Sequence, residues 1–147
     1  MVCLGNICRS PLAEGIMKSK IEKYKLNWAV DSAGTSSWHV GEKPDDRSIE
    51  VADQYSVNLR EQKSRQFAPY DFEQYDRIYA MDAANYRDIT GLALNEEETE
   101  KVRLILNEVY PGENRGVPDP YWDDNGFQKV FQMLDEACEQ IVKNEKM

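Results

Sequence analysis

The chain has 147 residues, 41% of them hydrophobic and 31% charged, which is typical of one globular domain with its own core. The formal net charge of −9 argues against nucleic acid and anionic membranes as partners. We find no apolar run near the ~18 residues that a membrane span requires and no signal-peptide pattern. Three cysteines, an odd number, indicate a reducing compartment, so we expect a cytoplasmic protein.

A Cys-x5-Arg pattern runs from Cys3 to Arg9 and is followed by Ser-Pro. Five intervening residues can wrap N–H groups around one tetrahedral anion, and Gly5 and Asn6 readily adopt the positive φ angles that such a loop needs. Ser10 is expected to cap a helix whose N-terminus favours the anion. Arg9 adds a planar fork for phosphate oxygens, and the Cys3 thiol is expected to ionise and act as a nucleophile. The alternative is a small core cysteine beside a solvated arginine.

The first half of the chain then reads as alternating elements. Only two residues precede Cys3, so the strand that carries the loop is expected to be unusually short. Apolar residues at helical spacing predict a helix from residue 11 to about residue 25. Asn27–Val30 reads as a short strand, and Arg47–Tyr55 as a helix with acidic residues at its start.

The second half continues the alternation. Its predicted elements are a short helix plus loop at Gln66–Tyr75, a strand at Asp76–Met81, a surface loop or helix start at Asn95–Glu100, a strand at Val102–Leu106 and a helix across Phe127–Ile141. No repeat or linker is visible. The chain is therefore predicted to form a single α/β domain over residues 1–147, an open parallel sheet with helices on both faces.

Several single residues are candidates for a site. Asp119 lies between two prolines on a stiff, extended loop, which suits a general acid, although an ordinary turn aspartate has the same appearance. Asp82 follows a predicted strand and is expected to cap the next helix. Trp38 is either a packing residue or an aromatic surface at the rim of a pocket. His39 is the only histidine, which argues against a metal site, and Cys138 lies on a core stripe.

Four blocks of the sequence, Val2–Pro11, Asp31–Gly41, Tyr79–Asn85 and Pro118–Trp122, resemble the low-molecular-weight protein tyrosine phosphatases. The resemblance covers nearly the whole chain. It implies a four-stranded parallel sheet in the order 2-1-3-4 and hydrolysis of phosphotyrosine in a protein or peptide through a cysteinyl-phosphate intermediate, with no metal or cofactor. We expect a monomer, with a weak or strand-exchanged dimer as the alternative.

The resemblance also implies a role for each site residue. Cys3 attacks phosphorus, and Asp119 protonates the departing phenolate and then acts as the base on water. Ser10 steadies the thiolate, Asn6 holds the shape of the loop, and Asp82 supports the site. The predicted phosphate-binding residues are Leu4, Gly5, Asn6, Ile7, Cys8 and Arg9. The predicted aromatic slot for the substrate consists of Trp38, Tyr121 and Trp122.

The sequence departs from the family pattern in three places. The first strand is nearly absent. The usual His-x-Ala-Arg-Gln segment corresponds here to Gln62–Gln66, so the partner of the loop asparagine is open. The ending D-P-Y-W leaves only Tyr121 as a tyrosine in that motif.

Other functions remain open at this level. Arsenate reductases of this fold need further downstream cysteines, and only Cys138 lies downstream. Phosphoarginine phosphatases tend to carry threonine where this loop has Ile7, so Ile7 favours an aryl phosphate. A non-catalytic redox or phosphate-binding module is a third alternative, in which Cys3 and Cys8 close a disulfide. Within an enzyme the same disulfide would be a regulatory switch. Turnover after reduction distinguishes the enzyme from the module.

Overall fold

Four short parallel strands form the centre of the protein in a computed structural model that describes residues 1–146; the last residue of the expected 1–147 domain lies outside this range. The strands are β1 (Val2–Cys3), β2 (Ala33–Gly34), β3 (Ile78–Ala80) and β4 (Val102–Leu104). Their order is β2-β1-β3-β4, with Val2 paired to Ala33 on one side and to Ala80 on the other. This confirms the predicted sheet order and the short first strand.

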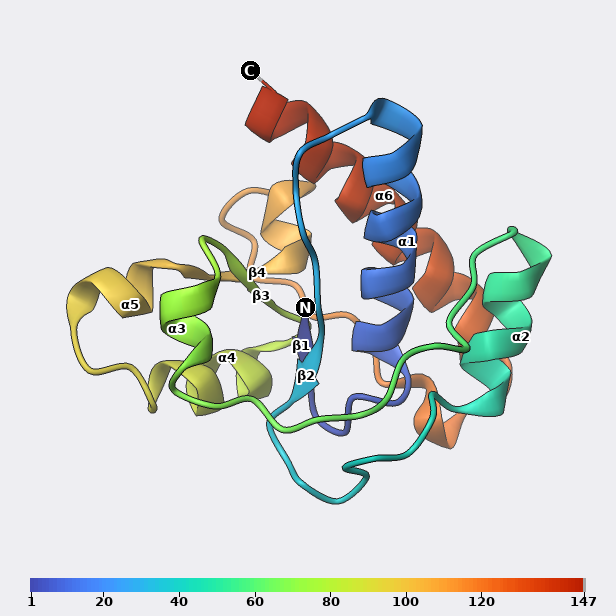
Figure 1. The fold of residues 1–147 in the computed structure, drawn as a ribbon, viewed down its shortest axis with the longest axis horizontal. Helices are drawn as coiled ribbons and strands as arrows, with labels where there is room; N and C mark the ends of the chain where they lie inside the picture. The colour runs from blue at the N-terminus through green and yellow to red at the C-terminus, as the bar shows by residue number, and fades with distance from the viewer. Residues whose placement is uncertain (147) are drawn as a thin grey trace.

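Helices cover both faces of the sheet. The α-helices are α1 (Arg9–Tyr24), α2 (Asp46–Gln54), α3 (Asp71–Gln74), α4 (Ala83–Thr90), α5 (Glu96–Glu100) and α6 (Gly126–Lys146), and the 3-10 helices are η1 (Ile105–Glu108) and η2 (Pro120–Trp122). Figure 1 shows α1, α2 and α6 on one side of the sheet and α3, α4 and α5 on the other. None of the helices in residues 1–146 has the length and apolarity to cross a bilayer.

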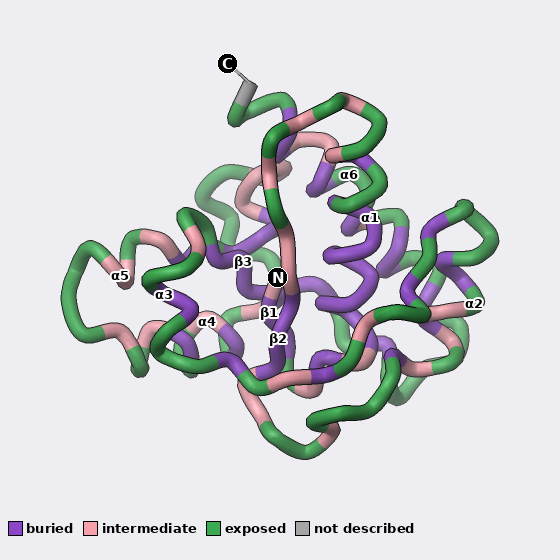
Figure 2. Tube along the Cα trace, viewed as in Figure 1, coloured by how far each residue is buried: buried purple, intermediate pink, exposed green. Residues whose placement is uncertain are grey.

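Each face of the sheet has its own hydrophobic cluster. Leu12, Ile16 and Leu134 are among the fully buried residues of the larger cluster, which joins α1 and α6 to the sheet. Phe72 and Ile89 belong to the smaller cluster under α3 and α4. Figure 2 shows the buried positions concentrated along the strands and along α1 and α6. The sheet is therefore closed off by apolar packing on both faces, which leaves its edges and the loops beyond its strands for a site.

Helix starts agree with the sequence at two places and differ at one. Asp45 caps α2 and Asp82 caps α4, since their carboxylates accept hydrogen bonds from the Arg47 and Asn85 amides at 2.9 and 2.8 Å. The prediction that Ser10 caps α1 is wrong. The cap position is Cys8, without a side-chain hydrogen bond, and Ser10 lies inside the first turn.

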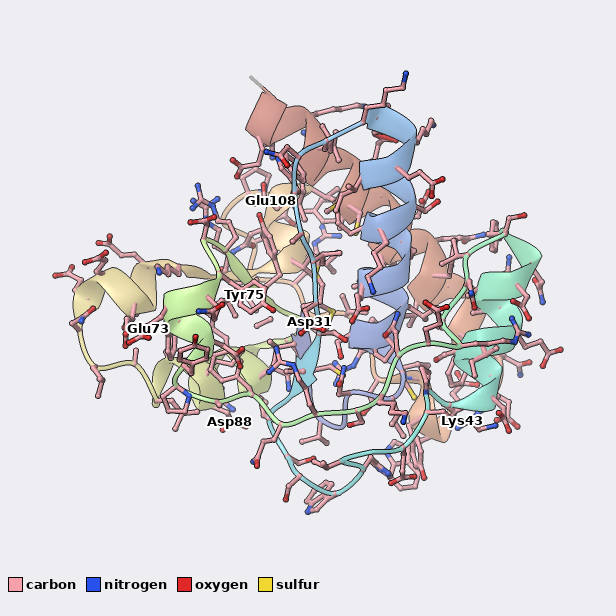
Figure 3. The ribbon with its side chains drawn as sticks, in the orientation of Figure 1. Asp31, Lys43, Glu73, Tyr75, Asp88 and Glu108 are labelled. Atoms are coloured by element: carbon pink, nitrogen blue, oxygen red, sulfur yellow. The ribbon has the colours of Figure 1, made fainter. Side chains whose placement is uncertain are left out.

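The predicted strand at Asn27–Val30 is also wrong. These residues are not in a strand. The strand next to β2 is β1, which begins only at Val2, opposite Ala33, so residues 27–30 have no strand beside them to pair with. A cavity of about 610 Å³ lies next to them, between this segment and β3. Asp31 and Tyr75 line this cavity, and the Tyr75 hydroxyl donates a hydrogen bond to Asp31 Oδ2 at 3.3 Å (Figure 3).

Candidate active site

The phosphate loop (residues 3–9) leaves the carboxyl end of β1 and enters α1 directly. Asn6 has a φ of 58°, so it supplies the left-handed turn that the sequence suggested for Gly5 and Asn6 together; Gly5 does not adopt a positive φ. Gly5 instead allows a close approach, because a Cβ there would lie 3.0 Å from His39 Cδ2. Within residues 1–146, the amides of residues 5–8 donate no hydrogen bond to another protein group. The loop therefore presents a set of free N–H donors at a helix N-terminus.

A buried polar network holds this loop in shape. Asn6 is 2% exposed, and its amide nitrogen donates to Ser10 Oγ at 2.8 Å and to Ser32 Oγ at 2.9 Å. Ser10 Oγ lies 3.1 Å from Cys3 Sγ, within hydrogen-bond distance. Ser32 in turn donates to the buried carboxylate of Glu14 at 2.6 Å. The thiol is thus the end point of a hydrogen-bonded chain that begins at a carboxylate on α1.

The segment that departs from the family pattern contacts the same loop. The main-chain N–H of Arg65 donates to Asn6 Oδ1 at 3.0 Å, so the partner of the loop asparagine is a backbone group. The Ser64 hydroxyl donates to the Gly5 carbonyl at 3.0 Å, and Gln62 donates to the Pro11 carbonyl at 3.0 Å. Serine at position 64 therefore adds a hydrogen bond to the phosphate loop that an alanine there could not make.

Arg9 is held in one orientation by partners from two later parts of the chain. It is 2% exposed, and its Nη1 donates to Asp82 Oδ2 at 2.7 Å and to the Val117 carbonyl at 2.9 Å. Asp82 thus both caps α4 and fixes Arg9. Burying a guanidinium costs desolvation energy, which its pairing with Asp82 offsets. Because the guanidinium is held in one orientation, its planar fork is suited to binding an oxyanion.

Asp119 lies beside Arg9 and belongs to the 117–125 loop, which contains η2. Its Oδ1 accepts a hydrogen bond from the Tyr121 amide at 3.0 Å, and its Oδ2 lies 3.7 Å from Arg9 Nη2. The Val117 amide donates to the Met81 carbonyl at 2.8 Å, which ties the start of this loop to the end of β3. The Asp119 side chain is 34% exposed, so it can exchange protons with solvent.

These groups meet in one cavity of about 250 Å³. Its lining residues are Cys3, Leu4, Gly5, Ile7, Cys8, Arg9, Trp38, His39, Asp119, Tyr121 and Trp122. Trp38 and Trp122 are 73% and 85% exposed, so Trp38 is a rim residue and not a packing residue. Asn6, Ser10 and Asp82 do not line the cavity and contact it through Cys3 and Arg9.

The other two cysteines differ from Cys3 in their surroundings. Burial raises the pKa of the Cys8 thiol, and nearby Asp45 and Cys3 raise it further. Burial also raises the pKa of Cys138 to about 12, and this thiol contacts the Ala13 carbonyl within the core. All three cysteines are free. No group of three metal-ligating side chains occurs in the described part of the chain.

Sequence reasoning missed Ser32, Glu14 and His39 as contributors to the site. Ser32 lies in the Asp31–Gly41 block that carried the resemblance, so the resemblance could have pointed to Ser32 as a site residue. Glu14 gives no such signal, because a glutamate between apolar helix residues usually faces water. His39 reaches the rim beside Gly5 and is held there by Glu42, whose carboxylate is 2.8 Å from its Nδ1.

Comparison with known proteins agrees with this geometry. A sequence model of the family "Low molecular weight phosphotyrosine protein phosphatase" matches residues 1–146. A low molecular weight protein-tyrosine-phosphatase of Streptomyces coelicolor is 38% identical over 141 residues, which cover 92% of this chain and 85% of that protein.

Solved structures give the same result. A protein tyrosine phosphatase from Entamoeba histolytica superposes with a TM-score of 0.90 at 35% identity, covering 99% of this chain and 96% of that one. A Drosophila arginine phosphatase superposes with a TM-score of 0.92 at 33% identity, covering 99% and 96%. With a family match along residues 1–146 and a cavity built from its Cys-x5-Arg loop, this chain belongs to the low molecular weight phosphotyrosine protein phosphatases.

Proposed function

We propose that Cys3, Arg9 and Asp119 carry out phosphotyrosine hydrolysis in this enzyme through a cysteinyl-phosphate intermediate. The observation that carries the assignment is their convergence: Cys3, the buried Arg9, the loop residues Gly5, Ile7 and Cys8 with their free amides, and Asp119 all line one cavity. In the first step Cys3 Sγ attacks phosphorus, an S–P bond forms and the P–O bond to the aryl group breaks. Asp119 gives its proton to the departing phenolate.

In the second step a water attacks the phosphoryl group. The Asp119 carboxylate accepts a proton from this water, the S–P bond breaks and phosphate leaves with the Cys3 thiolate restored. Ser10, at 3.1 Å from the sulfur, stabilises the thiolate as the leaving group. Arg9 and the loop amides bind the equatorial oxygens, where negative charge is spread in both transition states. Asp82 has a supporting role, because it orients Arg9.

The rim of the cavity favours an aryl phosphate. Leu4, Ile7, Trp38, Tyr121 and Trp122 contribute apolar and aromatic surface that can contact a phenyl ring. We propose a tyrosine-phosphorylated protein or peptide as the substrate, since the two tryptophans are exposed where flanking residues of a peptide would lie.

The structural similarity to an arginine phosphatase makes phosphoarginine the second candidate substrate. It is disfavoured because Ile7 presents an apolar side chain to the cavity, where a guanidino group would gain from a polar one. Comparing kcat/KM for a phosphotyrosine peptide and a phosphoarginine peptide of the same sequence decides between them. A higher value for phosphoarginine would overturn the aryl assignment.

Two functions other than phosphatase activity were open from the sequence, an arsenate reductase and a non-catalytic module. An arsenate reductase would need a downstream thiol that reaches Cys3, whereas Cys138 is fully buried in the core. A redox or phosphate-binding module would show no turnover after reduction. Cys3 and Cys8 remain a proposed regulatory pair: mild peroxide should inactivate the enzyme, and thiol treatment should restore it.

The decisive experiment is hydrolysis of p-nitrophenyl phosphate under reducing conditions by the wild type, Cys3→Ser and Asp119→Ala. Cys3→Ser should have no detectable turnover, and the kcat of Asp119→Ala should fall by about 10²- to 10⁴-fold. Activity in Cys3→Ser, or an unchanged Asp119→Ala, would contradict the nucleophile and general-acid roles of these residues.

We also propose a monomer in the cytoplasm without nucleic-acid or membrane partners. Light scattering tests the monomer against the strand-exchanged dimer.

A further inference from the structure

We propose that Arg47 is a positioning residue for proton transfer, because it joins the 117–125 loop to the phosphate loop and thereby sets the position of Asp119. This inference rests on the proposed function of Asp119. Arg47 does not line the active-site cavity, and nothing in the hydrolysis mechanism above requires it. Its contacts nevertheless reach both halves of the site.

On one side Arg47 is anchored to the start of α2. Its amide and Nε both donate to Asp45 Oδ1, at 2.9 and 3.0 Å, and its Nη2 donates to Asp45 Oδ2 at 3.0 Å. The Asp45 side chain is 13% exposed, and the Asp45 amide donates to the Ile7 carbonyl at 2.8 Å. The guanidinium therefore has a fixed position relative to the phosphate loop.

On the other side the same guanidinium contacts the loop that carries Asp119. Its Nη1 pairs with Asp124 of the loop, and its central carbon lies 5.5 Å from the ring centre of Tyr121, also in the loop, and 4.6 Å from that of Phe127 at the start of α6. These distances are within the range of cation–π contacts. The amide of Tyr121 donates to Asp119 Oδ1, so a shift of Tyr121 would move the carboxyl group.

These contacts argue for positioning and not merely for stability. The Asp124 side chain is 82% exposed, and an ion pair to so exposed a group adds little to folding stability. The contacts instead fix where the loop lies. Val117 bonds to Met81 and Arg9. Beyond Val117, the hydrogen bonds and ion pairs of residues 1–146 that join this loop to the phosphate-loop side of the cavity are those of Arg47 and the Arg9–Asp119 pair at 3.7 Å. A small displacement of a general acid has a large effect on its rate.

The test uses the dependence of rate on the leaving group. Phenyl phosphate needs protonation of its leaving oxygen much more than p-nitrophenyl phosphate does, so loss of acid catalysis affects it more. The measured quantity is kcat/KM, which reports the steps through release of the phenol. We expect Arg47→Ala to lower kcat/KM roughly tenfold for phenyl phosphate and at most about threefold for p-nitrophenyl phosphate. Added to Asp119→Ala, the same change should have almost no further effect.

The matched control is Arg60→Ala, which removes another arginine paired with an aspartate, in this case Asp53, beyond the far end of α2. It should leave both substrates unchanged. Inorganic phosphate should inhibit Arg47→Ala and the wild type equally, because the phosphate loop is intact. If Arg47→Ala does not fold, Arg47→Lys, which keeps the charge but not the fork or its stacking, serves in the same comparison.

Equal losses on the two substrates, or none on either, would overturn the proposal. A weaker inhibition by phosphate would also do so, because it would place the effect at the phosphate loop. A further loss when Arg47→Ala is added to Asp119→Ala would show that Arg47 acts through another group. An inactive wild type would instead refute the proposed function itself, so the two failures can be told apart.

Discussion

Replacing Asn6 by alanine is expected to destabilise the protein and disable its phosphate loop together. The side chain makes three hydrogen bonds in a place that is 2% exposed, to Ser10, Ser32 and the Arg65 amide. At a net value of about 1 kcal/mol each, their loss costs about 3 kcal/mol. The φ of 58° adds roughly 1 kcal/mol, because alanine is disfavoured there. The expected loss in the free energy of unfolding is therefore about 4 kcal/mol.

The assay is urea unfolding under reducing conditions, combined with p-nitrophenyl phosphate hydrolysis in the absence of urea. Asn27→Ala is the matched control, because Asn27 is exposed, and it should change stability by no more than about 0.5 kcal/mol. In the folded fraction of Asn6→Ala we expect kcat to fall on the order of 100-fold, since the amides of the loop lose their fixed positions. A variant within 1 kcal/mol of its control, with normal kcat, would show that the backbone alone holds the loop.

Three further outcomes follow from the charges and thiols. Burial raises the pKa of Asp45, but hydrogen bonds from Arg47 outweigh it and hold the pKa below the ordinary 3.8. The ionised form therefore stabilises the fold above pH 3.8 and this stabilisation is lost as the pH falls through the folded-state pKa. The stability difference between wild type and Asp45→Asn, followed by urea unfolding, should accordingly shrink below pH 3.8, and a difference that stays constant from neutral pH downward would contradict this. Iodoacetamide at neutral pH should label Cys3 before Cys8 and Cys138, whose pKa values burial raises, and peptide mapping that finds all three labelled equally would be inconsistent with their surroundings. Cys138→Ala should cost about 1 kcal/mol in urea unfolding and leave kcat/KM unchanged, whereas a loss of turnover would give Cys138 a part in the chemistry.

The elements that local pattern determines were predictable from the sequence. The apolar stripes predicted α1 and α6, Asp82 was expected to cap α4, and the acidic residues before Arg47 indicated the start of α2. The Cys-x5-Arg spacing and the proline-flanked Asp119 identified groups that the structure places in one cavity, although they are more than a hundred positions apart. Their catalytic roles stay predictions until the variants are measured.

The wrong predictions share one physical cause, which is that the deciding partner is distant in sequence. Asn27–Val30 was predicted as a strand, but β1, the strand next to β2, begins opposite Ala33 and does not extend beside these residues. Ser10 has the right type for a cap, but its hydroxyl is near Cys3 and Asn6 instead. The sequence also did not predict the contact of Glu14 with Ser32 or those of Arg47 with Asp124 and Phe127. None of these contacts leaves a local pattern.

The central position of β1 also bears on how the enzyme is made in the cell. Arg9 is synthesised 108 positions before Val117, whose carbonyl accepts a hydrogen bond from its guanidinium. At the usual pace of translation that interval is roughly 5 to 20 s. The flanking strand β3 and the packing of α6 on α1 come late as well. Cys3 and Arg9 are therefore synthesised well before the later residues that complete their site.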